Sequence, residues 1–136
     1  MEILEPRKTQ VLSVGTKGHI LHIEDDQEVA GLVVQVLNAN GYKVTHAKDG
    51  ISGLLAFTER PNRWAAILID LTLPHFTGNS LLKEMHRIRP ELPIIVLTGA
   101  EPEDSIGVYE LGAALVWQKP ISPSELLEHL KAVLDH

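Results

Sequence analysis

The sequence predicts an α/β domain in which five parallel strands form one sheet between two layers of helices. Short apolar runs rich in Val and Ile alternate with longer amphipathic segments from Gly18 onward. The run 65–69 (AAILI) shows no polar alternation, which is typical of a strand covered on both faces. Strict alternation of strand and helix favours right-handed crossovers and a parallel sheet. Five units are too few for an eight-stranded barrel, so we expect an open, doubly wound (βα)5 domain.

The strands are predicted where an apolar run of four to six residues lies between Pro, Gly or acidic residues. These runs, the one at 42–47 being the weakest, are 20–23, 42–47, 65–69, 94–97 and 115–117.

The helices are predicted where apolar residues recur at helical spacing between the strands. The first carries the stripe Val29, Val33 and Val36 and should end at Gly41, and the last begins at Pro123, a favoured first helical residue. The predicted helices are 27–39, 50–59, 79–88, 103–111 and 123–134.

The composition of the chain argues against several classes of protein. The 136 residues suit one domain, which we place at 19–136 after a tail at 1–18. With 12 Lys and Arg against 18 Asp and Glu, the net charge of −6 argues against direct binding of nucleic acid or an anionic membrane. The lack of cysteine excludes disulfides and thiol chemistry. Neither a membrane span nor a signal peptide is evident, so we expect a cytoplasmic protein.

Polar residues follow four of the predicted strands. Glu24 and Asp25 follow the first, Asp70 the third, Thr98 the fourth and Lys119 the fifth. Ligands of open α/β sheets bind outside the carboxyl ends of the strands, so these side chains should converge. Asp26 instead suits the N-cap of the following helix.

The chemistry of this set is specific. Clustered carboxylates repel one another unless a cation neutralises them, and oxygen ligands without His or Cys suit Mg²⁺. An Asp beside Mg²⁺, with a Lys and a Thr to hold an anion, indicates phosphoryl transfer to an aspartyl nucleophile. The pattern therefore predicts a phosphoryl-transfer site.

Four segments carry a family resemblance: HILHIEDD, ILIDLTLPHFTG, PIIVLTG and WQKP. In this order they resemble the receiver domain of two-component response regulators, of the single-domain, chemotaxis-regulator-like kind, over about residues 19–134. The resemblance implies a flavodoxin-like fold with strand order 2-1-3-4-5. It also implies a stand-alone signalling switch that catalyses only its own phosphorylation and slow dephosphorylation.

The resemblance assigns roles to individual residues. Asp70 would be the phospho-acceptor, Thr98 the switch hydroxyl and Lys119 the phosphoryl contact. The Mg²⁺ ligands would be Glu24, Asp25, Asp70 and the backbone carbonyl of Thr72. The Lys119–Pro120 peptide bond would be cis. The implied partners are a sensor histidine kinase or phosphotransfer protein and a downstream protein target, with a weak homodimer left open.

One position departs from the family pattern. The residue three before the lysine, often an aromatic that moves with the switch hydroxyl, is Val116, and Trp117 should point to the opposite face of the sheet. This departure concerns the route from phosphorylation to output and leaves the chemistry unaffected.

Two other functions fit part of the pattern. A phosphatase would also form an aspartyl phosphate, but it would carry D-x-D-x-T after its first strand, whereas Asp70 follows the third and Thr72 stands where the second acid would be. A degenerate receiver that only binds would lack the acceptor or a metal acid, and none is missing. None of the seven histidines is expected to be essential.

Overall fold

The computed structural model describes residues 17–70, 78–99 and 106–134. Within them, five parallel strands form one sheet in the order β2-β1-β3-β4-β5, as the resemblance implied. The strands are β1 (His19–Ile23), β2 (Lys43–Ala47), β3 (Ala66–Asp70), β4 (Ile94–Thr98) and β5 (Leu115–Gln118). The helices are α2 (Gln27–Ala39), α3 (Gly50–Glu59), α4 (Gly78–Ile88), α5 (Ile106–Glu110) and α6 (Pro123–Leu134), with a short 3-10 turn η1 (Pro61–Arg63) before β3.

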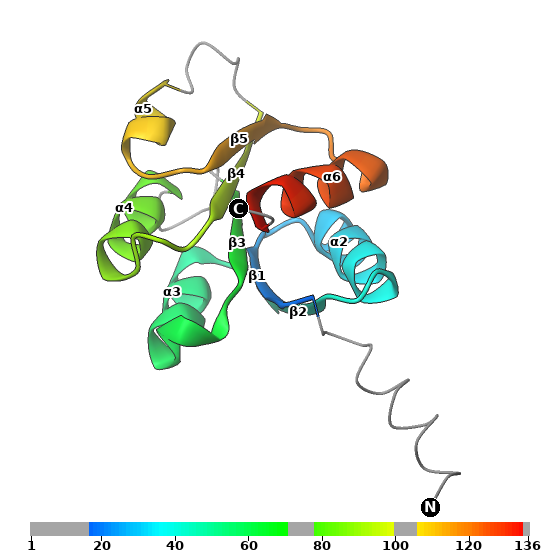
Figure 1. Ribbon diagram of the computed structural model, residues 1–136, viewed down its shortest axis with the longest axis horizontal. Coiled ribbons are helices and arrows are strands. Elements are labelled where there is room, and N and C mark those ends of the chain that lie inside the picture. The colour runs from blue at the N-terminus through cyan, green and yellow to red at the C-terminus, as the bar shows by residue number, and fades with distance from the viewer. Residues whose placement is uncertain (1–16, 71–77, 100–105, 135–136) are drawn as a thin grey trace, which may run out of the picture.

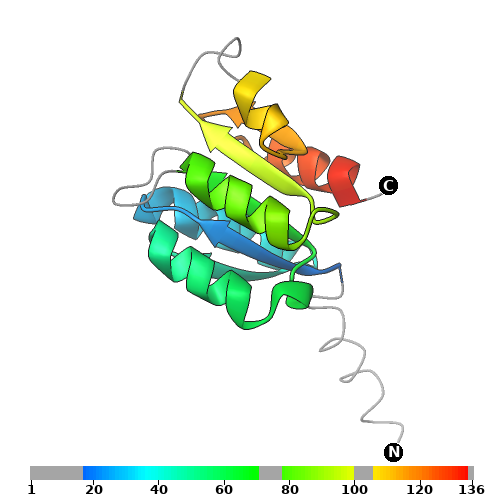
Figure 2. The ribbon, with the colours of Figure 1, turned by 90° about the vertical axis from the view of Figure 1, so that its left-hand side faces the viewer.

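The sheet lies between two layers of helices (Figure 1). Helices α3, α4 and α5 cover one face, and α2 and α6 cover the other, as the view turned by 90° also indicates (Figure 2). Strands β1, β3 and β4 lie inside the sheet, and every residue of β3 and β4 is buried. The doubly wound architecture follows from this double cover.

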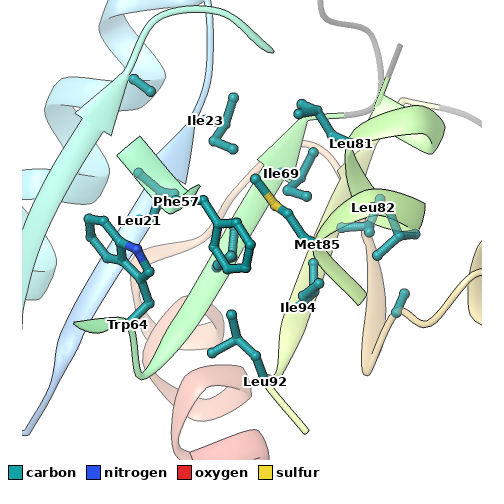
Figure 3. Packing of buried hydrophobic residues seen from close by; sticks show 14 of the residues in the cluster. Leu21, Ile23, Phe57, Trp64, Ile69, Leu81, Leu82, Met85, Leu92 and Ile94 are labelled. Carbon is teal, nitrogen blue, oxygen red and sulfur yellow. The ribbon is translucent and has the colours of Figure 1, made fainter. Parts of the chain in front are cut away.

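Each face of the sheet has its own hydrophobic core. On the α3–α4 side, Phe57 and Met85 pack over strand residues such as Ile69, with the indole of Trp64 at the edge of the cluster (Figure 3). On the other side, side chains of α2 and α6 pack on β1, β3, β4 and β5; among them are Val33, Leu37, Leu126 and Leu130. Packing of the two cores holds the strands in place. It therefore also fixes the strand ends, where the polar residues lie.

The observed bounds differ from the predicted ones by one residue at one or both ends of every strand, by one residue at the start of α4, and at both ends of α5. Strand β3 runs one residue further than 65–69 because Asp70 pairs with Leu97 in the ladder. Helix α5 spans 106–110 rather than 103–111, and residues 103–105 lie outside the described residues. The turn η1 was not predicted, since three residues carry no periodicity. The helices at 27–39, 50–59 and 123–134 have the predicted bounds.

The start of the domain is tied to the sheet by backbone hydrogen bonds. The amide of Lys17 donates to the Gly41 carbonyl at 3.0 Å, and the amide of Lys43 donates to the Gly18 carbonyl at 3.0 Å. Residues 1–16 lie outside the described residues, so the boundary between tail and domain at 18/19 stays a prediction. Over the described ranges, every helix is too short or too polar to cross a lipid bilayer.

Candidate functional site

The acceptor predicted from the sequence, Asp70, is the last residue of β3 and is almost fully buried. Burial of an ionised carboxylate is unfavourable unless charged or hydrogen-bonding neighbours compensate for the lost hydration. The neighbours come from two other strand ends. Glu24 follows β1, which pairs with β3, and Lys119 follows β5.

The three consecutive acids after β1 have different surroundings. Glu24 is fully buried, whereas Asp25 is exposed. Asp26 caps α2, because its Oδ1 accepts the amides of Glu28 at 2.9 Å and Val29 at 3.2 Å. The prediction that Asp26 serves the helix is therefore confirmed, which leaves Glu24 and Asp25 for the site.

Glu24, Asp25 and Asp70 form one carboxylate cluster. One oxygen of each lies within 4.8 Å of the others. The ammonium of Lys119 donates to Oδ2 of Asp70 at 3.1 Å and to Oε2 of Glu24 at 3.4 Å, and the same Oε2 accepts the Asp26 amide at 3.3 Å. The sheet thus brings together four of the residues that the sequence predicted for the site.

The charges in this cluster are unbalanced. Burial, together with a hydrogen bond and the negative charge of Asp70, raises the pKa of Glu24 to about 7, although Lys119 and the Asp26 amide oppose this. Burial would lower the pKa of Lys119, but its contacts with Asp70 and Glu24 raise it above the ordinary value. The ammonium therefore stays charged at neutral pH, while Glu24 is only partly ionised.

Thr98 and Lys119 are linked through the backbone at the same end of the sheet. Thr98 is the last residue of β4 and is buried, and its carbonyl accepts the Lys119 amide at 2.8 Å. The Lys119–Pro120 peptide bond is cis, as the resemblance implied. Thr72, whose carbonyl was predicted to be a further metal ligand, lies outside the described residues.

The donor set of the cluster fits Mg²⁺. All of its ligand atoms are carboxylate oxygens, which hard divalent cations prefer. Of the three carboxylates, those of Glu24 and Asp70 contact the Lys119 ammonium, and Oε1 of Glu24 has no hydrogen-bond partner among the described residues. Burial and the neighbouring Asp70 raise the pKa of Glu24, and a divalent cation would oppose both effects by stabilising the ionised carboxylate.

Comparison with known proteins agrees with this geometry. The family model for the response regulator receiver domain matches residues 20–131. The chain belongs to the receiver domain family. Receiver domains are signalling switches that act with histidine kinases or phosphotransfer proteins.

The chain is similar both to solved structures of response regulators and to curated transcriptional regulatory proteins. A structure described as a CheY-like response regulator receiver domain from Methanospirillum hungatei JF-1 is 34% identical, with a TM-score of 0.80 over 87% of this chain and 94% of that one. The chemotaxis protein CheY4 of Vibrio cholerae is 28% identical, with a TM-score of 0.80 over 86% and 98%. The alkaline phosphatase synthesis transcriptional regulatory protein PhoP of Bacillus subtilis is 34% identical over 85% of this chain and 48% of its own.

The chain spans about half the length of the curated relatives it matches. Because these relatives are named as transcriptional regulators, the comparisons do not support the expectation of no contact with nucleic acid. That the receiver domain acts without an attached output domain stays a prediction.

Two histidines that were not expected to be essential lie next to the carboxylate cluster. His22 in β1 is fully buried, and its Nε2 lies 3.9 Å from Oε1 of Glu24. His46 in β2 contacts the Glu24 carbonyl through Nε2 at 2.6 Å. Strand alternation places residues 22 and 24 on one face, so the proximity of His22 could have been inferred, but only the register between β1 and β2 reveals that of His46.

Val116, which stands where the family often has an aromatic residue, is contacted by a tyrosine of α5. Val116 packs against the α3–α4 core, whereas Trp117 lies in the other core, where its ring makes a T-shaped contact with that of His129. This confirms the predicted opposite orientation. The Val116 amide donates to the hydroxyl of Tyr109 at 3.0 Å. A tyrosine from α5 thus contacts the strand at the position where the family often has an aromatic side chain.

Proposed function

We propose that the receiver domain accepts a phosphoryl group on Asp70 from a phosphohistidine of its partner, in a reaction that depends on Mg²⁺. The observation that carries this proposal is the contact of a buried Asp70 with Lys119 beside Glu24 and Asp25. A lone aspartate at a strand end has many structural uses. An aspartate that lies beside two further acids and an ammonium is arranged to accept a phosphoryl group on its oxygen.

The chain's own residues have defined tasks in this reaction. A carboxylate oxygen of Asp70 attacks phosphorus while the phosphorus–nitrogen bond of the phosphohistidine breaks, and the bonding electrons leave with the imidazole. Lys119 balances negative charge on the transferring oxygens. Bound Mg²⁺, held by Glu24, Asp25, Asp70 and the Thr72 carbonyl, would neutralise the same oxygens.

Thr98 is proposed as the switch hydroxyl. Its place at the end of β4, joined by its carbonyl to the Lys119 amide, supports a hydrogen bond to the phosphorylated Asp70. Such a bond would bias the segment after β4 toward a second conformation and so alter the binding of a downstream protein.

A hollow of about 560 Å³ beside Lys119 supports an approach route for the phosphorylated partner. It lies between α2 and the segment after β5, and Val29, Leu32 and Ile121 give it apolar walls. Asp26 and Lys119 line the same hollow and connect it to the carboxylate cluster. An apolar surface that ends at Lys119, which contacts the acceptor, suits a helix that presents a histidine. A weak homodimer stays a further proposal for the same chain.

Treatment with acetyl phosphate tests this function. Wild type in Mg²⁺ should gain the mass of one phosphoryl group, and the gain should vanish in Asp70→Asn or when EDTA replaces Mg²⁺. A phosphatase would instead release phosphate over many turnovers without a lasting adduct. A degenerate receiver would show no adduct under either condition, and both results contradict the proposal.

A further inference from the structure

Glu24 is a buried acid whose two oxygens are unequally supported. Its Oε2 contacts the Asp26 amide at 3.3 Å and the Lys119 ammonium at 3.4 Å. Its Oε1 has no hydrogen-bond partner among the described residues. An unpartnered buried oxygen is energetically unfavourable, so an acid kept in this state needs a structural reason.

The polar atom that faces Oε1 belongs to His22. Nε2 of His22 lies 3.9 Å away, and both residues are fully buried. Neither ring nitrogen of His22 has a hydrogen-bond partner in the part of the chain that the structure describes. Two unpartnered polar atoms therefore face each other, and a shift of about 1 Å would bring them to hydrogen-bond distance.

The backbone of Glu24 is held by a second histidine. His46 is the register partner of His22 across the β1–β2 ladder, and the two ring centroids are 6.0 Å apart. Nε2 of His46 lies 2.6 Å from the Glu24 carbonyl oxygen. A carbonyl can only accept, so His46 donates from Nε2 in this contact.

We propose that His22 and His46 are positioning residues that hold Glu24 in the orientation that binds Mg²⁺. His46 fixes the main chain by donating to the carbonyl, and His22 donates Nε2–H to Oε1 when Glu24 is ionised beside the metal. Groups that orient a metal-binding carboxylate commonly change metal affinity by about 10- to 100-fold. The inference rests on the proposed Mg²⁺ site.

Paired substitutions at each histidine test this role. A glutamine amide places an N–H close to the position of the histidine Nε2–H, whereas leucine fills similar space without a donor. His22→Leu and His46→Leu should weaken Mg²⁺ binding about tenfold, measured by titration of amide shifts. His22→Gln and His46→Gln should restore most of the affinity. His19→Leu is the matched control, because His19 lies at the far end of β1 and contacts Thr45; its Mg²⁺ affinity should equal that of wild type.

Three results would overturn the inference: wild-type Mg²⁺ affinity in both Leu variants, no recovery in the Gln variants, or equal weakening in the His19 control. Long-range ¹H–¹⁵N spectra give an independent readout, since His22 and His46 should both carry the proton on Nε2 in Mg²⁺, and a proton on Nδ1 of either would contradict the assignment. Acetyl phosphate labelling at saturating Mg²⁺ separates the two proposals. Its absence in wild type would refute the phosphorylation proposal, whereas the Mg²⁺ titrations test the histidines.

Discussion

The ammonium of Lys119 lies 3.1 Å from Oδ2 of Asp70, although 49 residues separate them in the chain. The same nitrogen lies 3.4 Å from Oε2 of Glu24, so one cation joins two buried carboxylates from different strands. This cation therefore links the end of β3 to the segments that follow β1 and β5.

Removal of this cation should destabilise the protein when Mg²⁺ is absent. Lys119→Met leaves Asp70 and Glu24 buried without their shared donor, which we expect to lower the free energy of unfolding by about 1–3 kcal/mol at pH 8. Urea unfolding of Lys119→Met and of the exposed-site control Lys83→Met measures it. Equal stability of the two variants would show that the contact is energetically neutral.

Because the pKa of Glu24 is raised, we expect the free energy of unfolding to depend on pH. Its folded pKa of about 7 lies above its ordinary 4.5, so the stability that its protonation contributes is complete below about pH 4.5 and is lost as pH rises through 7. Glu24→Gln should remove this loss and therefore raise the melting temperature more at pH 8 than at pH 5. An increase that is the same at both pH values would contradict a raised pKa.

The contribution of His22 to the free energy of unfolding should have the opposite dependence on pH. Burial, reinforced by the charges of His46 and Lys119, lowers its pKa from 6.5 to about 3. The stability from its neutral form is complete above pH 6.5 and is lost as pH falls toward 3. His22→Leu should therefore gain melting temperature over wild type as pH falls from 7 to 5. A gain that stays constant over this range would exclude the titration of His22.

Two glycines in helices should respond to alanine in opposite directions. A Cβ on Gly31 of α2 would meet no atom within 4 Å, whereas a Cβ on Gly53 of α3 would lie 2.5 Å from Cδ1 of Ile23. Gly31→Ala should stabilise by about 0.5–1 kcal/mol through helix propensity. Gly53→Ala should destabilise by about 1–3 kcal/mol, because Ile23 is fully buried and must move. Stabilisation by both substitutions would contradict the tight packing of α3 on β1.

The hydrogen bond between Tyr109 and Val116 predicts slow exchange at one amide. Tyr109→Phe removes the acceptor of the Val116 amide, worth about 1 kcal/mol, so hydrogen exchange there should accelerate about fivefold. Labelling by acetyl phosphate should be unchanged, since the hydroxyl contacts β5 rather than the carboxylate cluster. Unchanged exchange at Val116, measured by NMR, would show that the contact does not protect the strand.

The fold could be predicted from the sequence because its signals are local. Apolar runs such as 65–69 carry the strand pattern within five residues, and the amphipathic stripes mark α2 and α6. Alternation then determines a parallel sheet, while the strand order came from the family resemblance and the ladders confirm it. The short turn η1 has no such periodicity and was missed.

The site was predicted where residues follow strands in a regular way. Glu24, Asp70 and Lys119 each lie at a strand end, so strand counting alone places them at one edge. The contact of His46 with the Glu24 carbonyl depends on the register between β1 and β2, which no local pattern encodes. The same applies to Tyr109, which contacts the backbone of Val116 through the packing of α5 on β5.

The most direct test of the account is the location of the phosphoryl group. After treatment with acetyl phosphate in Mg²⁺, borohydride reduces an aspartyl phosphate to homoserine with release of phosphate, and peptide mass spectrometry then identifies the converted residue. Homoserine should form at position 70 in wild type, and no residue should be converted in Asp70→Asn. Conversion at Asp25 instead, or a stable phosphate on one of the histidines with Asp70 unchanged, would contradict it.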